Sequence, residues 1–369
     1  MLVEASAAPG PPRSALSDTD LLEGAVLGWE MAAAPQLITP EEAVALDDEM
    51  RAFVVPYRAI GDPAMKLRRL LEGMRDRGLF AMSYSDSFTR SASRTFHERQ
   101  GNCLSFTMLF VALARAAGLD ARYQMVDVPP TWTNDNELVV IANHVNTAVN
   151  QSYARGATAR SGEPFPRAQF DRKIVVDFNA ANFRANYQSR VVADRYVVAL
   201  FYNNLAAEAL VRKQYAEGFE LLREAARTYS DMPAPWVNLG VLYSRMGQYA
   251  YAEAAYRRAL EADPREQAAL SNLVAVYNSL GDDALAEEYR QRIRRYREIN
   301  PYYHYAVAQI AFDERRFEDA LAALRSAIRL KRDDDDFYDL RGRTLVELGR
   351  DDRAVASFAR AKELASEDH

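Results

Sequence analysis

The sequence predicts an α+β domain followed by an all-α array of helical repeats, in one chain of 369 residues. Three observations lead to this fold class. An apolar stretch of helical length lies within residues 98–118, and several short strand-like segments follow it. Strand patterns then disappear from about residue 199, where a period of 34 residues takes over. The apolar content of 49% is typical of a globular protein, so both parts have enough apolar residues to form a core.

The N-terminal 38 residues precede the first strong helix signal. Residues 1 to about 17 are rich in Ala, Pro and Ser, and we expect residues 1–38 to be disordered or extended. Thr39 and Pro40 then form a helix start, followed by an acidic block from Glu41 to Glu49. Helical periodicity returns over residues 65–74, and residues 83–93 are polar and loop-like.

The stretch from Glu98 to Gly118 is expected to be a central, buried helix. Its apolar residues lie on nearly every face, and Gly118 is a C-terminal stop signal. Cys103 is the only cysteine in the sequence and lies at the start of this helix. Unpaired N–H groups and the positive end of the helix dipole stabilise a thiolate there. The alternative is that Cys103 is a small buried apolar residue.

Three strand-like segments follow this helix. Residues 121–128 end at two prolines, residues 138–149 are rich in β-branched side chains, and residues 173–178 form a short third segment. Residues 156–166 are expected to be a loop. We therefore predict a domain over residues 39–198, with a central helix packed against a small antiparallel sheet.

Residues 199–369 carry the repeats. The spacing of one 34-residue unit follows the tetratricopeptide pattern at Trp236, Leu239, Gly240, Tyr243, Ala252, Tyr256 and Pro264. Small residues recur at this period and allow paired helices to approach closely, which predicts five units starting near residues 199, 233, 267, 301 and 335. The third and fourth units match less well, because Arg290 and His304 stand where apolar or aromatic residues are usual.

A thiolate nucleophile needs a base, and the base needs an acceptor that holds its ring. Among the four histidines, His144 lies in a predicted strand of the same domain as Cys103. Asp177 ends the next predicted strand, so neighbouring strands would place Nδ1 of His144 beside Asp177 and direct Nε2 at Cys103. Taken singly, a histidine within a strand is usually structural, and an acid after a strand is usually a turn residue.

The cysteine region resembles the transglutaminase-like superfamily over residues ~79 to ~180. The resemblance rests on Arg99, Gly101, Cys103, Ala114, Arg115, Gly118, Ala121 and Arg122. It implies a papain-like fold in which Cys103 is the nucleophile, His144 the base and Asp177 the orienting acid. The implied chemistry is acyl transfer through a thioester, ending in hydrolysis or transamidation. Val145 and Asn146 follow the histidine where many relatives have an aromatic residue.

The oxyanion of such a reaction needs hydrogen-bond donors. The backbone N–H of Cys103 is one candidate, and Gln100, Asn102 and Tyr84 are candidates for a second. The alternative for Gln100 and Asn102 is helix capping.

Two functions follow from this organisation. The first is a cysteine enzyme that acts on an amide bond, with the repeats recruiting a protein substrate or partner. The second is a catalytically inactive domain in a protein-binding scaffold. In either case the repeat groove would bind a protein or peptide, and its candidate contacts are Asn238, Asn272, Arg245 and Tyr305. The alternative is that these side chains are solvated or bonded within the array.

Several other classes receive no support from the sequence. The net charge of −6 gives no reason to expect nucleic acid as a partner, and no apolar run reaches the ~18 residues of a membrane span. The run from Asp333 to Asp336 lacks the spacing of a calcium loop, so we expect no metal, and we expect no cofactor either. The localisation is not fixed by the sequence. A cytoplasmic location is the default, and a bacterial periplasmic one is the alternative if the true start carries an export signal.

Overall fold

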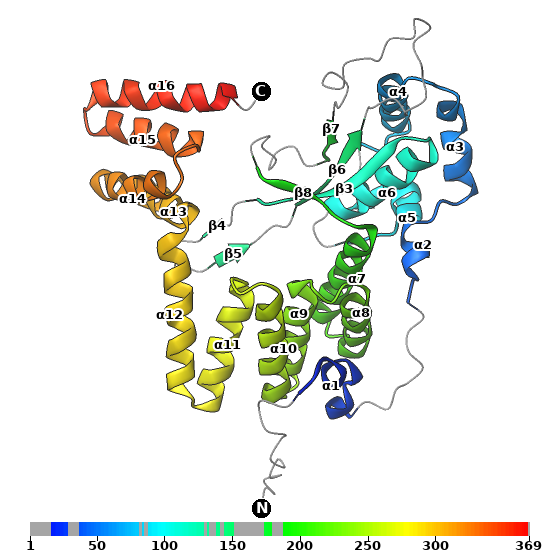
Figure 1. The fold of residues 1–369 in the computed structure, drawn as a ribbon, viewed down its shortest axis with the longest axis horizontal. Helices are drawn as coiled ribbons and strands as arrows, with labels where there is room; N and C mark the ends of the chain where they lie inside the picture. The colour runs from blue at the N-terminus through cyan, green and yellow to red at the C-terminus, as the bar shows by residue number, and fades with distance from the viewer. Residues whose placement is uncertain are drawn as a thin grey trace, which may run out of the picture. The chain divides into compact units, whose positions relative to one another are not determined.

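The computed structural model describes residues 16–28, 37–80, 83–84, 88–128, 131–132, 138–140, 144–150, 173–178 and 187–367 (Figure 1). Their contacts divide the chain into two compact units. Unit 1 comprises Met1–Val126, His144–Ala181 and Ser189–Asn272, and unit 2 comprises Asp127–Asn143, Asn182–Gln188 and Leu273–His369. Each unit is described by itself.

The first helices of the α+β part of unit 1 begin where side chains cap them. They are α2 (Pro40–Val44), α3 (Asp48–Arg58), α4 (Pro63–Asp76), α5 (Ala92–Glu98) and α6 (Cys103–Ala116). Thr39 and Glu42 form a capping box at α2, while Asp47 and Asp62 accept backbone N–H bonds at the starts of α3 and α4. The predicted helix starts at Thr39 and in the cysteine stretch are both present.

A four-stranded antiparallel sheet packs against α6. Its strands are β3 (Asp120–Val126), β6 (His144–Asn150), β7 (Lys173–Val176) and β8 (Ser189–Val191), in the order β7-β6-β3-β8. Residues 147 and 176 lie opposite each other in the register of β6 and β7, so the chain just beyond β7 lies near the start of β6. A short parallel pair, β1 (Ser83–Tyr84) and β2 (Gln100–Gly101), lies directly before α6.

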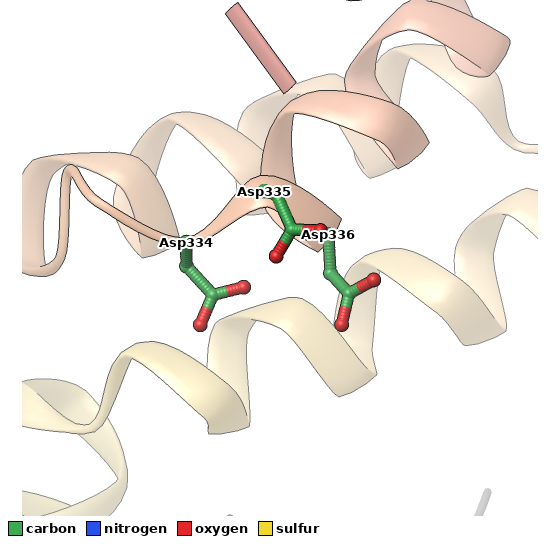
Figure 2. Close-up of side chains that lie close together, drawn as sticks. All are labelled: Asp334, Asp335 and Asp336. Carbon is green, nitrogen blue, oxygen red and sulfur yellow. The ribbon is translucent and has the colours of Figure 1, made fainter. Parts of the chain in front are cut away.

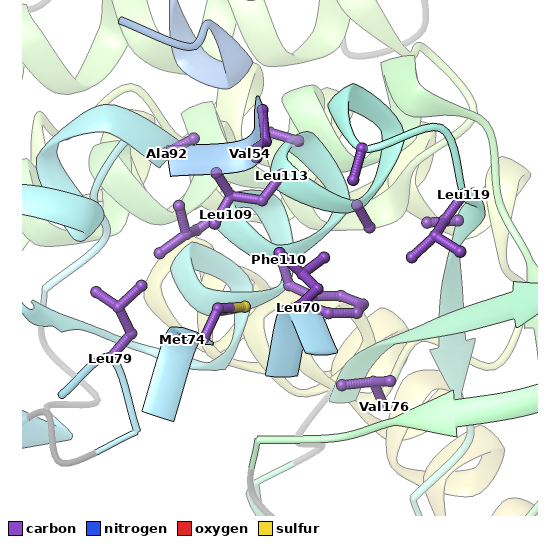
Figure 3. Packing of buried hydrophobic residues seen from close by; sticks show 14 of the residues in the cluster. Val54, Leu70, Met74, Leu79, Ala92, Leu109, Phe110, Leu113, Leu119 and Val176 are labelled. Carbon is purple, nitrogen blue, oxygen red and sulfur yellow. The ribbon is translucent and has the colours of Figure 1, made fainter. Parts of the chain in front are cut away.

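The core of this part forms around α6, which is buried from Leu104 to Ala114. Side chains from α3, α4 and α5 pack on it from the helical side, and Val149 and Val176 do so from the sheet (Figure 3). A helix that is apolar on all faces is stable only inside such a core. The expected arrangement of a central helix against a small antiparallel sheet is confirmed.

Three segments differ from the sequence predictions. Residues 138–149 form two strands, β5 (Leu138–Val140) and β6, because β5 pairs with β4 (Thr131–Trp132) whereas β6 pairs with β3. Strand β8 was not predicted, since its three residues are exposed and show no apolar alternation. Residues 16–28, expected to be disordered or extended, form α1 (Asp18–Glu23) and the 3₁₀ helix η1 (Ala25–Leu27), while 1–15 and 29–36 lie outside the described residues.

The repeats form pairs of helices. In unit 1 these are α7 (Asp194–Val211), α8 (Tyr215–Thr228), α9 (Pro233–Arg245), α10 (Tyr249–Ala262) and the first part of α11 (Gln267–Leu280). Unit 2 contains the rest of α11 and α12 (Asp283–Ile299), α13 (Pro301–Asp313), α14 (Phe317–Leu330), α15 (Asp335–Glu347) and α16 (Asp351–Glu367). The predicted boundary at residue 199 falls inside α7. In unit 2, β4 contacts α13.

One hydrogen bond recurs at the same position of three repeats. The ring nitrogen of Trp236 donates to the carbonyl of Ser230, and the hydroxyl of Tyr338 donates to the carbonyl of Arg332. His304 places Nε2 3.0 Å from the carbonyl oxygen of Glu298, the equivalent atom. His304 therefore replaces the usual aromatic residue without loss of this contact.

Two glycines allow large rings to lie against the first helix of a pair. A Cβ built on Gly240 would lie 2.4 Å from the ring of Tyr256, and one on Gly342 would lie 2.6 Å from the ring of Phe358. Both distances are far below van der Waals contact, so these positions need glycine for as long as the ring is present.

Candidate functional site

Cys103 is the first residue of α6, as the sequence predicted. The side chain of Asn102 caps the helix by accepting the N–H of Ser105 at 3.0 Å, and the thiol is partly exposed. A Cβ on Gly101 would lie 2.7 Å from Cβ of Ser105, so glycine is required for the tight turn that leads into the helix. This turn leaves the sulfur at the positive end of a helix dipole.

The structure brings His144 and Asp177 to the same place. His144 begins β6, Asp177 follows β7, and the ring nitrogen Nε2 lies 2.6 Å from Oδ2 of Asp177. Only 6% of the His144 side chain and 8% of the Asp177 side chain are exposed. Cys103 lies close enough to the ring of His144 to raise its pKa. Three residues far apart in the sequence therefore lie together, with His144 bonded to Asp177 and Cys103 close to the same ring.

The orientation of the His144 ring is the reverse of the prediction. We expected Nδ1 beside Asp177, but Nε2 occupies that position, which leaves Nδ1 for Cys103. An Nε2–H donated to Asp177 leaves an Nδ1 lone pair that can accept the thiol proton.

The surroundings of His144 favour its charged form. Burial alone would lower the pKa of the ring, but the hydrogen bond to Asp177, the nearby Cys103 and the charges of both groups outweigh it and raise the pKa to about 9. The ring is then an imidazolium at neutral pH. A positive charge beside a thiol favours the thiolate, which is the nucleophilic form.

Asn146, which the sequence showed only as a departure from the family pattern after the histidine, also belongs to this site. Its side-chain nitrogen donates to Oδ2 of Asp177 at 3.0 Å, and the residue is fully buried. The signal was present in the sequence, because a residue two positions after His144 projects from the same face of the strand. Asn146 fixes the carboxylate that in turn holds the ring.

The three candidates for a second oxyanion donor occupy different positions. The side chain of Asn102 accepts from Ser105 and donates to Oγ1 of Thr89 at 2.9 Å, which is the capping alternative. Gln100 is exposed in β2, and the backbone of Tyr84 pairs with Gly101. The structure therefore brings the backbone of Tyr84 near the start of α6 and leaves the amide of Asn102 bound elsewhere.

His97, close to Cys103 in the sequence, belongs to a separate cluster. Its Nε2 lies 2.8 Å from Oδ2 of Asp47, and this oxygen also accepts the hydroxyl of Ser93, while Oδ1 of Asp47 accepts the N–H of Met50. Burial opposes ionisation of Asp47, but these bonds and the nearby His97 lower its pKa to about 2. This cluster ties α5 to the start of α3.

A cavity of about 790 Å³ borders the carboxylate on the side of α4. Apolar side chains of α4, α6 and β7 line it, and Phe178 stacks at 5.7 Å on both Phe80 and Phe106. Arg68, Glu72 and Arg75 of α4 form its polar part. The cavity therefore presents both apolar rings and charged side chains next to Asp177.

The aspartates after α14 lie together at the start of α15. Asp334, Asp335 and Asp336 place one carboxylate oxygen each within 4.8 Å of one another (Figure 2). Asp334 already has partners, because the hydroxyl of Tyr302 lies 3.1 Å away and Nζ of Lys331 lies 3.4 Å away. Burial raises the pKa of Asp334. Tyr302 and Lys331 thus stabilise the start of α15 through Asp334.

The predicted groove residues are divided between the units. In unit 1, Asn238 donates to Oδ1 of Asn203 at 2.9 Å, Arg245 donates to the carbonyl of Leu210 at 3.0 Å, and Asn272 is half-buried in α11. Tyr305 belongs to unit 2, where its ring centroid lies 5.0 Å from that of Phe337. Asn238 and Arg245 thus bond within the array, as the alternative interpretation proposed.

Family comparisons agree with this architecture. Residues 51–158 match the transglutaminase-like superfamily, and residues 233–266 and 305–369 each match the tetratricopeptide repeat. The chain joins a transglutaminase-like core to tetratricopeptide repeats. Cys103 and His144 lie inside the matched core, whereas Asp177 lies beyond its end. No helix among the described residues has the length and apolar character to cross a membrane.

Individual relatives are similar to the repeats. Tetratricopeptide repeat protein 16 of Mus musculus is 29% identical over 115 residues, which are 31% of this chain and 15% of that protein. MamA of Desulfovibrio magneticus RS-1 is 20% identical, with 47% of this chain and 97% of that chain covered and a TM-score of 0.26. YrrB, described as having an unusual peptide-binding site, is 18% identical over 45% of this chain and 86% of its own, also with a TM-score of 0.26.

Proposed function

We propose that the transglutaminase-like domain, residues 39–198, is a cysteine enzyme that acts on peptide or side-chain amide bonds through a thioester. The observation that carries this proposal is the 2.6 Å bond between His144 and Asp177, with Cys103 close to the same ring. Each group alone has an ordinary structural explanation. Together they offer a nucleophile, a base and an orienting acid, the set of groups that acyl transfer requires.

The reaction follows from the proton positions. The Cys103 thiolate attacks the carbonyl carbon, and the C=O π electrons move to oxygen and form a tetrahedral oxyanion. The Nδ1–H of His144 donates its proton to the leaving nitrogen as the C–N bond breaks, which leaves a thioester on Cys103. Neutral His144 then takes a proton from water or an amine, and that nucleophile displaces the sulfur. Asp177 holds the ring throughout by accepting Nε2–H.

The start of α6 provides the electrostatic part of the site. The backbone N–H of Cys103 belongs to the first turn of the helix, where N–H groups have no partner inside the helix. Such a donor stabilises the oxyanion more strongly than the neutral carbonyl, so it lowers the barrier. We assign this N–H as one oxyanion donor.

The repeats are proposed to recruit a protein substrate or partner to this domain. Paired helices with closely packed small residues are the fold of tetratricopeptide arrays, which bind proteins and peptides. Joining such a module to a catalytic domain raises the local concentration of substrate without adding contacts at the active site.

The first test uses the fact that Cys103 is the only cysteine in the sequence. Native protein at neutral pH is treated with iodoacetamide, and alkylation is followed by intact-mass spectrometry. We expect the native thiol to react faster than the denatured one, and His144→Gln to remove this difference. Equal, slow labelling of native and denatured protein would reject an activated nucleophile.

The second test addresses acyl transfer. p-Nitrophenyl acetate should give a burst of one nitrophenolate per chain, with an acetyl group on Cys103 that appears in the intact mass. Cys103→Ala should give neither the burst nor the added mass. An activated but unacylated thiol would support a reactive cysteine and contradict the enzyme proposal.

A further inference from the structure

Helix α1 lies on the first two repeats of unit 1, next to α10 (Figure 1). Three positions spaced three apart, Asp18, Leu21 and the C-cap Gly24, contact the array. We call the residues beneath them, Phe219, Trp236, Tyr243 and Arg258, the α1-docking surface. Each of the three positions on α1 meets a different member of this surface.

Asp18 meets a cation that the array holds in place. The Nε of Arg258 lies 3.1 Å from Oδ2 of Asp18, while the same guanidinium lies over the ring of Trp236 and donates to the carbonyl of Ser230. Only 16% of the Arg258 side chain is exposed, compared with 50% for Asp18. Asp231 and Glu261 of the array lie 3.7 and 3.9 Å from the same guanidinium, so the array orients the arginine and Asp18 adds the nearest carboxylate.

Leu21 and Gly24 occupy the apolar part of the surface. Leu21 is 1% exposed, and its carbonyl accepts the hydroxyl of Tyr243 at 2.6 Å. A Cβ on Gly24 would lie 2.4 Å from the ring of Phe219, and its φ of +65° lies in the region that favours glycine. The surface therefore recognises an acid, a leucine and a glycine in the order D-x-x-L-x-x-G.

The size of α1 argues that it is a ligand of the repeats and not part of their core. It has six residues, and Leu21 is the only buried residue among the described positions 16–28. A helix this short does not form alone in water, so its order depends on the surface that it contacts. The repeats, in contrast, carry their own core of buried residues in α7 to α10.

We propose that the α1-docking surface is a binding site for short acidic helical peptides of the D-x-x-L-x-x-G type. Residues 16–28 fill it in cis, and a partner protein that carries the same pattern displaces them. A tethered segment acts at an effective concentration on the order of millimolar, so such a partner competes only if it binds well or is itself abundant. This site is separate from Cys103 and does not depend on the enzymatic proposal.

The test uses the full chain and a fluorescent peptide with the sequence of residues 16–28. Leu21→Asp releases the cis segment, and anisotropy then measures binding of the peptide in trans. We expect the released chain to bind the peptide at least ~10-fold more tightly than the wild-type chain, where the site is occupied. Absence of peptide binding to the released chain would overturn the proposal.

A charge reversal identifies the contact. In the Leu21→Asp background, Arg258→Glu should weaken the peptide at least ~10-fold, and a peptide carrying Asp18→Arg should recover binding to that variant. Arg227→Glu, at an exposed position of α8, is the matched control and should leave binding unchanged.

A second variant of the full chain, Asp18→Arg, changes only the charged contact and retains Leu21. Unfolding of both this variant and Leu21→Asp, seen by circular dichroism, would make α1 part of the fold and would also overturn the proposal.

Discussion

Replacing Asp177 with Asn should lower the pKa of His144 and slow the reaction of Cys103. The amide oxygen of the new side chain can still accept a hydrogen bond from Nε2–H, so the ring keeps its orientation, but the negative charge is lost. Burial, which lowers the pKa of the ring, is then opposed by fewer favourable interactions. The pKa of His144 should therefore fall from about 9 to its ordinary value of 6.5 or below.

The magnitude follows from these two values. A fall from about 9 to 6.5 corresponds to about 3 kcal/mol of lost preference for the imidazolium. At pH 7.5 nearly all of the wild-type ring is protonated, whereas roughly a tenth of the variant ring is. Because the thiolate is favoured by the imidazolium, we expect alkylation of Cys103 at pH 7.5 to slow roughly tenfold.

Proton NMR of the imidazole C–H signals measures the titration, and loss of one signal in His144→Gln assigns it. Asp120→Asn, at an exposed acid that begins β3, serves as the control and should leave both the titration and the alkylation rate unchanged. If Asp177→Asn leaves the His144 midpoint near its wild-type value, the carboxylate does not set the charge of the ring and the reasoning is wrong.

Three further changes test other contacts. Asn146→Ala removes the 3.0 Å bond to Asp177, and should slow alkylation several-fold and cost about 1–3 kcal/mol in the free energy of unfolding. Gly240→Ala introduces a Cβ 2.4 Å from the ring of Tyr256, and urea unfolding should show a loss of about 1–3 kcal/mol. Asp47→Ala removes the cap of α3, with an expected cost of about 1 kcal/mol near neutral pH. The pKa of Asp47 is lowered from 3.8 to about 2, so its contribution is present above about pH 4 and is lost as the pH falls through 2, and melting curves of the variant should depend less on pH in that range.

For each of these changes, one result would contradict the expected outcome. Unchanged alkylation in Asn146→Ala would mean that the carboxylate keeps its position without the amide. Gly61→Ala, where no atom lies within 4 Å, is the control for the glycine change, and an equal effect of both would remove the steric explanation. If the melting temperature falls equally with decreasing pH in wild type and in Asp47→Ala, other carboxylates determine the pH dependence of stability.

The sequence was sufficient where a local pattern determines the structure. The apolar faces of residues 104–113 required a buried helix, and the 34-residue period defined the repeats. The orientation of the His144 ring could not be predicted, because it depends on a side-chain contact with a residue 33 positions later in the chain. Helix α1 was missed for a related reason. The hydroxyl that binds the carbonyl of Leu21 comes from Tyr243, 222 residues later in the chain, and no window of local sequence contains both.

The glycine-and-ring contact of the repeats constrains how these units can be exchanged. Gly240 lies beneath Tyr256 and Gly342 beneath Phe358, whereas Ala308 at the equivalent position shares a cluster with the smaller Leu324. In these three units the two positions therefore vary together: glycine stands opposite an aromatic ring, and alanine stands opposite the smaller leucine. A chimera that transplants only one helix of a pair would join a bulky ring to a methyl group or leave a void, so whole helix pairs are the modules that protein engineers should move.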